Sequence, residues 1–342
     1  MEISIFTTVA TLLGGLAVFI FGMNLMSEGL QKSAGDKMRN ILAMLTANPV
    51  FGVLAGALTT AVLQSSSATT VMVIGFVSAG LMKLPQAISV ILGANIGTTI
   101  TAQLIAFNIG DYAWIFVFVG FIMMFFLKHK EKIRDIGEIA FGFGLLFVGI
   151  NTMGDVMKPL ANAQAFTDLM LKVSDIPILG VLLGIISTMV IQSSSAVIAV
   201  LQNLAATPGP DGVTSVIGLT GALPILFGSN IGTTITALMA SVGASVNAKR
   251  TAVAHTIFNF GGTLIFIWFI PQISKLVHWL SPKGAEVGVI AREIANAHLL
   301  FNVVCTLLFI PFIWLLVKIV TKIVPGEDKQ ILQNEPVFLD EK

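Results

Sequence analysis

Long apolar windows separated by short charged segments dominate this chain. No charged residue occurs within 40–82, 84–110, 176–210 or 212–248. A helix that crosses the hydrocarbon core of a bilayer needs about 20 apolar residues. The pattern therefore predicts an all-α polytopic membrane protein, with seven crossings near 5–30, 85–109, 112–127, 137–157, 214–246, 251–270 and 297–320.

In two of these charge-free windows, a short polar stretch interrupts the apolar sequence at the position where the middle of a membrane-spanning helix would lie. Pro49 marks a helix start, and Gln64 in "LQSSSATT" ends that leg after residues 50–63. Fourteen residues span roughly 21 Å, which is less than the core thickness of about 30 Å. Pro177, Gln192 and the turn "TPGPDG" repeat this arrangement. We predict re-entrant helical hairpins at 49–82 and 177–207 with tips inside the membrane, where irregular backbone is tolerated only if protein buries it or it lines a watery cavity.

The chain is an internal duplication. "FGVLAGALTTAVLQSSSA" (51–68) matches "LGVLLGIISTMVIQSSSA" (179–196), and "GANIGTTITA" (93–102) matches "GSNIGTTITA" (228–237). A weaker match joins "FGMNLM" (21–26) to "VGINTM" (148–153). Each repeat is therefore predicted to contain a helix, a hairpin and a crossing interrupted at its Gly-Asn-Ile-Gly-Thr-Thr segment.

These matches divide the chain into segments. We assign residues 1–127 to the first repeat, 128–135 to a basic cytoplasmic linker, 136–270 to the second repeat, 271–320 to an extra-cytoplasmic loop and final helix, and 321–342 to a polar tail. The interrupted crossings are 85–109 and 214–246, followed by helices at 112–127 and 251–270.

Loop charge predicts that the two repeats are inverted. Lys32, Lys37 and Arg39 follow the first helix, and four more basic residues lie within 128–134, so both loops are predicted to be cytoplasmic. The loop at 155–175 has mixed charge and is predicted to be external. This places the N-terminus outside and the C-terminus in the cytoplasm. Inverted repeats with hairpins and broken helices are typical of secondary transporters.

Composition agrees with a membrane protein and excludes other classes. Hydrophobic residues make up 55% of the chain and charged residues 11%, with a mean hydropathy of +0.92, whereas soluble domains have about 25% charged residues. A net charge of +1 without a basic stripe argues against nucleic-acid binding. The single Cys305 excludes an internal disulfide. Because Glu2 stands where a signal peptide would be basic, we expect the first helix to be retained.

The hairpin tips and the Gly-Asn-Ile-Gly segments carry the candidate chemistry. Serine hydroxyls and helix N-termini can bind an anion, and serine is a preferred N-cap. Asn and Thr oxygens can bind a hard cation where a helix unwinds. Neither hairpin nor either segment contains Lys or Arg. Any bound anion would therefore depend on neutral donors, helix ends and co-bound cations.

Simpler structural roles compete with these functions. In one alternative, each Gln-Ser-Ser-Ser tip forms hydrogen bonds between helices and has no other role. Likewise, the hydroxyls of Thr98, Thr99, Thr233 and Thr234 could bond to carbonyls of their own helices without binding an ion. "AHTIFN" (254–259) and "AHLLFN" (297–302) add His255 and His298. These histidines could relay protons or touch a substrate, although their place near the start of predicted crossings favours interfacial packing.

The paired Gln-Ser-Ser-Ser tips, each followed by Gly-(Ala/Ser)-Asn-Ile-Gly-Thr, and the Ala-His-x-x-Phe-Asn signature resemble the bacterial branch of the type II sodium–phosphate cotransporter family. The resemblance implies sodium-driven uptake of inorganic phosphate across the inner membrane, with Na⁺ as coupling ion and no other cofactor. Carried over by motif, the phosphate region comprises Gln64, Ser65, Ser66, Ser67, Gln192, Ser193, Ser194 and Ser195, and the sodium region comprises Asn95, Thr98, Thr99, Asn230, Thr233 and Thr234.

Several alternatives stay open from the sequence. The same scaffold suits a non-coupled anion channel or a phosphate exporter, other oxyanions such as arsenate or sulfate fit neutral donors, and a homodimer is one option for the assembly. A more remote alternative is an intramembrane hydrolase that pairs a tip serine with His255 or His298. The chain has no Gly-x-Ser-x-Gly elbow to support it.

The inverted topology predicts opposite labelling of two loops. In a Cys305→Ala background, Glu131→Cys should react with a membrane-impermeant thiol reagent only from the cytoplasmic side. Asp168→Cys should react only from outside, because the basic loop stays in the cytoplasm. Labelling of both cysteines from one side would contradict the inversion.

Overall fold

The computed structural model describes residues 5–34, 48–107, 110–127, 130–160 and 164–327. Three short 3-10 helices, η1 (Gly110–Tyr112), η2 (Ile267–Phe269) and η3 (Ile310–Phe312), join longer α-helices. In chain order the α-helices are α1 (Ile5–Ala34), α3 (Pro49–Leu63), α4 (Ser66–Ser78), α5 (Leu84–Gly97), α6 (Thr99–Ile105), α7 (Ala113–Phe125), α8 (Glu131–Leu160), α9 (Gln164–Asp175), α10 (Pro177–Ile191), α11 (Ser194–Ala205), α12 (Gly218–Ala240), α13 (Val246–Phe266), α14 (Ile270–Leu280), α15 (Glu286–Phe309) and α16 (Ile313–Ile323). The predicted all-helical fold class is confirmed.

Within the described residues, six helical stretches are long and apolar enough to cross a bilayer. They are Phe6–Ser33, Leu84–Ile105, Glu131–Met157, Gly218–Ala240, Val246–Leu280 and Glu286–Ile323. The seventh predicted crossing, at 112–127, is α7, an apolar helix of 13 residues. It is about 20 Å long and therefore shorter than predicted, because η1 occupies the residues before it.

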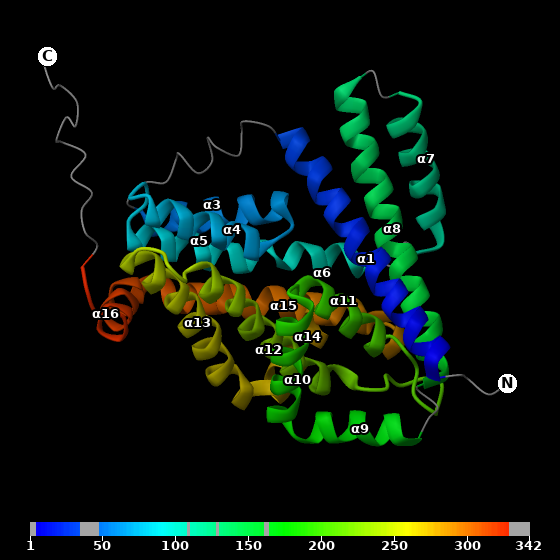
Figure 1. The fold of residues 1–342 in the computed structure, drawn as a ribbon. Coiled ribbons are helices and arrows are strands. Elements are labelled where there is room, and N and C mark those ends of the chain that lie inside the picture. The colour runs from blue at the N-terminus through cyan, green and yellow to red at the C-terminus, as the bar shows by residue number, and fades with distance from the viewer. Residues whose placement is uncertain (1–4, 35–47, 108–109, 128–129, 161–163, 328–342) are drawn as a thin grey trace, which may run out of the picture.

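Helices α1, α7 and α8 stand together at one side of the molecule (Figure 1). Glycines allow this close packing: a Cβ built on Gly22 of α1 would lie 2.6 Å from the Gly142 carbonyl oxygen of α8. Likewise, a Cβ on Gly120 of α7 would lie 2.3 Å from the Phe141 nitrogen of α8. Small residues let helix backbones approach in a membrane, where burial in lipid gives no hydrophobic driving force between helices.

Each half contains a helix–tip–helix hairpin where the sequence predicts one. The first joins α3 to α4, and the second joins α10 to α11. The first legs have 15 residues each and begin with Pro49 and Pro177, where proline is tolerated because the first helical N–H has no partner in the helix. Helix α9 meets α10 at a bend of 108° and lies across its end (Figure 1).

The first helix of each hairpin packs against the next long helix, α3 against α5 and α10 against α12, with the two backbones in direct contact. A Cβ added to Gly93 of α5 would come within 1.9 Å of the Val53 carbonyl oxygen of α3. The second half repeats this contact, since a Cβ on Gly228 of α12 would lie 2.0 Å from the Val181 carbonyl oxygen of α10. Real Cβ atoms essentially never approach within 3.0 Å, so only glycine fits at either position.

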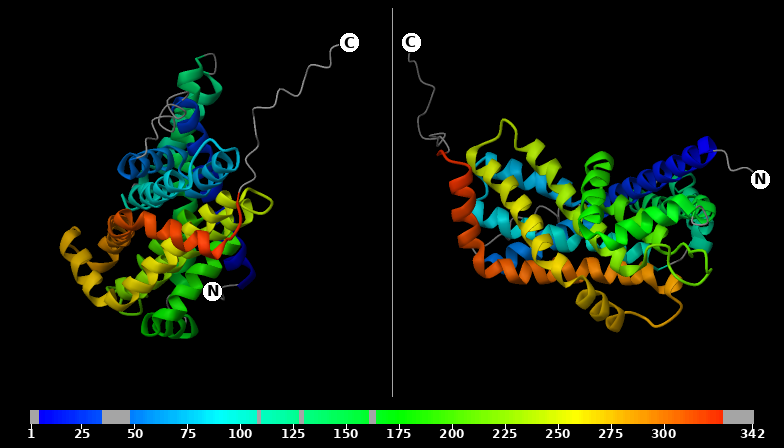
Figure 2. Two further views of the ribbon diagram at one scale, coloured as in Figure 1. Left: turned by 90° about the vertical axis from the view of Figure 1, so that its left-hand side faces the viewer. Right: turned by 90° about the horizontal axis from the view of Figure 1, so that it is seen from below.

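The C-terminal helices close the core between the two halves. Phe227 of α12 stacks on Phe301 of α15 with ring centroids 4.8 Å apart, and Phe266 of α13 packs edge-on against both rings. Figure 2 shows α15 running along the molecule beneath the α3–α5 and α12–α13 layers. The core is therefore built from helices of both halves.

The predicted interruption of the two long crossings is present in the first half and wrong in the second. In the first half the helix divides into α5 and α6 at Thr98, but the backbone there stays helical and the Thr98 N–H donates to the Ala94 carbonyl. In the second half α12 runs through its segment without a break. In α12 the helix continues through the whole segment, so the predicted unwinding for a cation does not occur there.

The prediction of a loop after residue 271 is also wrong. Residues 271–280 form most of α14, and α15 begins at Glu286, before the predicted start at 297. Charged side chains of α15 find partners there: Glu293 pairs with His278 at 2.7 Å, and Arg292 donates to Gln103 Oε1 at 2.6 Å. Charged residues can lie on a helix when such partners satisfy them.

Because α15 starts early, His298 lies in mid-helix rather than near the start of a crossing. His255 and His298 are 1% and 2% exposed, so both side chains are buried within the protein. The basic residues Lys37, Arg39 and Lys128, and positions 328–342 of the tail, lie outside the described residues.

The glycine contacts predict which alanine substitutions the fold tolerates. Gly93→Ala or Gly228→Ala must push two backbones apart, and such overpacking costs about 1–3 kcal/mol or more. Gly75→Ala is the matched control, because a Cβ there meets nothing within 4 Å and alanine favours the helix.

Thermal unfolding of the purified proteins in detergent provides the measurement. The melting temperature should fall for Gly93→Ala and Gly228→Ala and stay level or rise for Gly75→Ala. Equal melting temperatures for all three variants would contradict the proposed tight contacts.

Candidate functional site: a neutral cavity between two hairpin tips

Each hairpin turns at a glutamine with a left-handed backbone. Gln64 has φ 53° and Gln192 has φ 59°, and these are the only positive values at non-glycine residues in the described chain. This conformation costs roughly 1–2 kcal/mol for an L-residue, and local bonds offset it. The Gln64 N–H donates to the Thr60 carbonyl at 2.7 Å, and the Gln192 N–H donates to the Thr188 carbonyl at 2.8 Å.

The glutamine side chains are fixed in the same way in both halves. The Nε2 group of Gln64 donates to the Ala61 carbonyl, and that of Gln192 donates to the Met189 carbonyl. Their Oε1 atoms accept hydroxyl protons from Thr101 at 2.9 Å and Thr236 at 3.1 Å. Each long helix therefore holds the hairpin tip that packs against it.

The next residue caps the second leg of each hairpin. Ser65 Oγ accepts from the Ala68 N–H at 3.1 Å, and Ser193 Oγ accepts from the Ala196 N–H at 3.2 Å. Helices α4 and α11 therefore begin at the tips, where first-turn N–H groups have no helical acceptor and carry partial positive charge. The serine N-caps expected from the sequence are present.

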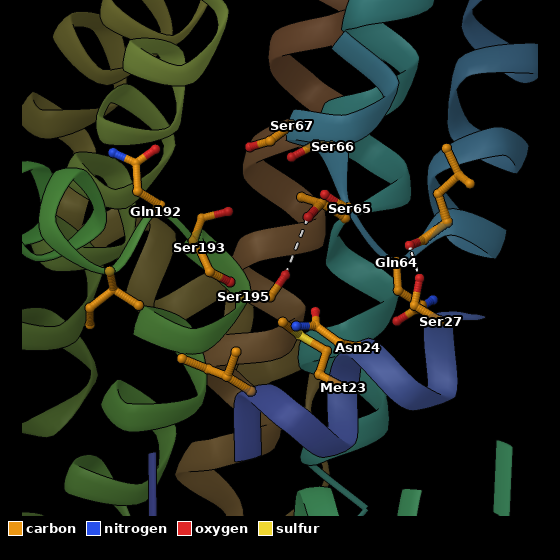
Figure 3. A pocket seen from close by; sticks show the side chains of 15 residues that line it. Met23, Asn24, Ser27, Gln64, Ser65, Ser66, Ser67, Gln192, Ser193 and Ser195 are labelled. Atoms are coloured by element: carbon orange, nitrogen blue, oxygen red, sulfur yellow. Dashed lines mark hydrogen bonds between the residues drawn. The ribbon is translucent and has the colours of Figure 1, made fainter. Parts of the chain in front are cut away.

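Both tips line one cavity of about 210 Å³. The serines of the two tips face it from opposite sides, and Met23 and Asn24 reach it from α1 (Figure 3). All eight residues predicted for the phosphate region line it: Gln64, Ser65, Ser66, Ser67, Gln192, Ser193, Ser194 and Ser195. The cavity can hold an ion with several water-sized groups.

The lining of this cavity contains neutral side chains throughout the described residues. The hydroxyls of Ser66 and Ser194 have no hydrogen-bond partner in the part of the chain that the structure describes. Ser195 Oγ lies 3.5 Å from Thr98 Oγ1. The site therefore offers free hydroxyls, amides and helix ends, but no formal charge.

The residues predicted for sodium do not gather in this cavity. Of that set only Thr98 lines it. The other side chains are buried and bond back to their own helices: Asn95 to Ile91, Thr99 to Ile96, Asn230 to Leu226, Thr233 to Ser229 and Thr234 to Ile231. The alternative role of these threonines, bonding to their own helix carbonyls, therefore holds for Thr99, Thr233 and Thr234.

Four residues of this site were missed from the sequence. Asn24 and Ser27 of α1 line the cavity, and Ser27 Oγ donates to the Leu63 carbonyl at 2.5 Å. Thr101 and Thr236 position the two glutamines. Asn24 belongs to the repeated "FGMNLM" motif and the threonines to "TTITA", so the duplication itself was the available signal.

The two halves of the chain contribute unequally to the central cavity. Gln64 is 4% exposed beneath α1, whereas Gln192 is exposed. Asn151, which matches Asn24 in the repeat, lines a separate cavity of about 390 Å³ with Asp111 and Asn203. The glutamine of the first tip is therefore covered, whereas the glutamine of the second tip is not.

Comparison with known proteins identifies the family. The sequence profile described as Na⁺/Pi-cotransporter matches the chain twice, over residues 18–155 and 149–281. The chain belongs to the Na⁺/Pi-cotransporter family. The predicted resemblance is confirmed, and the hydrolase alternative is not supported, because this is a family of transporters and no histidine lines the cavity among the described residues.

Relatives in this family come from bacteria and animals. "Uncharacterized protein YqeW" of Bacillus subtilis is 35% identical over 78% of this chain and 84% of its own length. "Putative inorganic phosphate export protein YjbB" of Escherichia coli K12 is 26% identical over 82% of this chain but only 50% of its own length. Human "Sodium-dependent phosphate transport protein 2B" is 38% identical over 29% of this chain and 15% of its own length. No solved structure gives a significant match.

Proposed function

We propose that this chain is a secondary active transporter that couples the uptake of inorganic phosphate to sodium across the bacterial inner membrane. The observation that carries the proposal is that both Gln-Ser-Ser-Ser tips line one cavity without a charged side chain. Two hairpin tips that meet at one central site suit alternating access, in which one half moves against the other.

The tips are suited to an oxyanion. The free hydroxyls of Ser66 and Ser194 can donate to phosphate oxygens from opposite sides of the cavity. The N-termini of α4 and α11 add N–H donors and partial positive charge at the same place. Phosphate would therefore be held by neutral donors from both halves.

Sodium would supply the charge that the cavity lacks. A phosphate anion in a neutral, partly buried site pays a large desolvation cost unless a cation shares the site. Thr98 is the sodium candidate nearest the tips, 3.5 Å from Ser195. We assign Asn95, Thr99, Asn230, Thr233 and Thr234 to sodium only through the side-chain oxygen lone pairs that remain free while these groups donate to their helix carbonyls.

The charged ends of α1 and α8 favour the proposed topology. Lys32 near the end of α1 pairs with Glu138 near the start of α8 at 2.5 Å, and Arg134 contacts Asp135 and Glu138. Lys32 and Arg134, which belong to the described parts of the two basic loops, therefore lie at one end of this helix pair, as expected if both loops face the cytoplasm. We propose an external N-terminus and a cytoplasmic C-terminus on this basis.

Phosphate export is the second candidate function. The Escherichia coli relative that aligns with 82% of this chain is named "Putative inorganic phosphate export protein YjbB". The same cavity serves either direction, since a coupled transporter runs down the combined gradient of its ions. A non-coupled channel differs from both, because it moves phosphate without any response to sodium.

Purified protein in proteoliposomes should accumulate radiolabelled phosphate when sodium is higher outside, and should release it when the gradient is reversed. Choline replacement should abolish accumulation, because the neutral cavity then lacks its cation. By linkage, sodium should raise phosphate affinity by the same factor as phosphate raises sodium affinity. Equal phosphate flux in sodium and choline would instead indicate a channel.

Because both tips line one cavity, we predict that one serine hydroxyl from each half contributes to phosphate affinity. Ser66→Ala and Ser194→Ala should each weaken phosphate affinity roughly ten- to hundredfold, since a lost bond to a charged group costs about 1.5–3 kcal/mol. The double variant should be non-additive, because both hydroxyls bind one ligand. Phosphate dependence of uptake, normalised to folded protein, measures both effects.

Ser241→Ala is the matched control for these variants, because the buried Ser241 hydroxyl bonds only to the Leu238 carbonyl, away from the cavity. It should lose only stability, by about 0.6 kcal/mol. Wild-type phosphate affinity in both Ser66→Ala and Ser194→Ala would remove these hydroxyls from the site.

A further inference from the structure

Helices α13 and α15 carry the same buried polar stripe, with His, Asn and Thr at intervals of four residues. Its members are His255, Asn259 and Thr263 on α13, and His298, Asn302 and Thr306 on α15, each no more than 5% exposed. Residues four apart share one face of a helix. Polar groups buried at this depth cost free energy unless they are paired, so the contacts of each stripe are informative.

The threonines attach the stripes to the two Gly-Asn-Ile-Gly helices. Thr263 Oγ1 donates to the Phe227 carbonyl of α12 at 3.4 Å, and Thr306 Oγ1 donates to the Leu92 carbonyl of α5 at 3.3 Å. Phe227 lies three residues before Asn230, and Leu92 lies three residues before Asn95. Each stripe is therefore anchored one turn from a candidate sodium residue.

His298 contacts one of these residues directly. Its Nε2 lies 3.3 Å from Asn230 Oδ1, while Asn230 Nδ2 donates to the Leu226 carbonyl at 3.4 Å. The second bond orients the amide so that its oxygen faces the imidazole. An oxygen acceptor requires a donor, so His298 must carry its proton on Nε2.

We propose that His298 is a positioning residue that holds Asn230 Oδ1 in place for sodium. This inference rests on the proposed function. An amide oxygen has two acceptor lone pairs, so Oδ1 can accept from His298 and still face a cation. Without this bond the Asn230 amide is held only by its 3.4 Å bond to the Leu226 carbonyl, and loss of such a supporting contact typically lowers metal affinity by about 10–100-fold.

His255 supplies an internal control. It occupies the matching position of the other stripe and is as deeply buried, but neither ring nitrogen has a hydrogen-bond partner among the described residues. Its side chain therefore holds no candidate sodium residue in this structure. Removing its nitrogens should leave sodium binding unchanged, whereas removing those of His298 should not.

The test measures sodium binding without transport, as the sodium-dependent rise in melting temperature of the purified protein at fixed phosphate. Choline keeps the ionic strength constant. His298→Phe should raise the half-saturating sodium concentration by about 10–100-fold. His298→Gln should stay within about threefold of wild type, because its amide N–H can replace Nε2–H, and His255→Phe should match wild type.

His298→Asn is a second loss variant in case the larger phenylalanine prevents folding. Its shorter amide cannot reach Asn230, so it should show the same loss as His298→Phe. An unchanged sodium dependence in a folded loss variant, equal shifts for His298→Gln and His298→Asn, or an equal shift for His255→Phe would overturn the positioning role. A wild-type protein that sodium does not stabilise would overturn the proposed function and this inference with it.

Discussion

The contact on which the site depends is the glycine-mediated approach of each hairpin to its long helix. Gly93 and Gly228 bring α5 and α12 against the backbones of α3 and α10. Two turns further along, this register places Thr101 and Thr236 beside Gln64 and Gln192. The glutamines can then adopt the left-handed conformation that turns the chain and lets a serine cap the next helix. A side chain at either glycine would push the long helix away from the hairpin and so displace the threonine, the glutamine and the serine N-cap that depend on this contact.

Local signals were sufficient to predict the hairpins. Pro49 and Pro177 mark helix starts, and a polar tip after fifteen helical residues in an apolar window cannot be a full crossing. The clustering of the eight tip residues was predicted through the family resemblance and the duplication. The contribution of α1 was not, because Asn24 and Ser27 meet the tips only through tertiary packing.

The errors share a different cause. The second Gly-Asn-Ile-Gly segment was predicted to unwind, yet Asn230 and Thr233 bond to carbonyls of the same helix, and α12 runs through without a break. A loop was predicted after residue 271, but α14 and α15 form there, with Glu293 and Arg292 paired within the fold. In both cases the pairing of polar groups depends on neighbours that a sequence pattern does not reveal.

The neutral lining of the central cavity also determines how the membrane voltage acts on the protein. Moving one elementary charge through 100 mV changes the free energy by about 2.3 kcal/mol, and the described lining carries no formal charge of its own to move. When the tips rearrange around their cargo, the charge displaced at the cavity is therefore that of the ions it holds. The steepness of the current–voltage relation would then report the net charge of those ions, with no correction for fixed charges at the site.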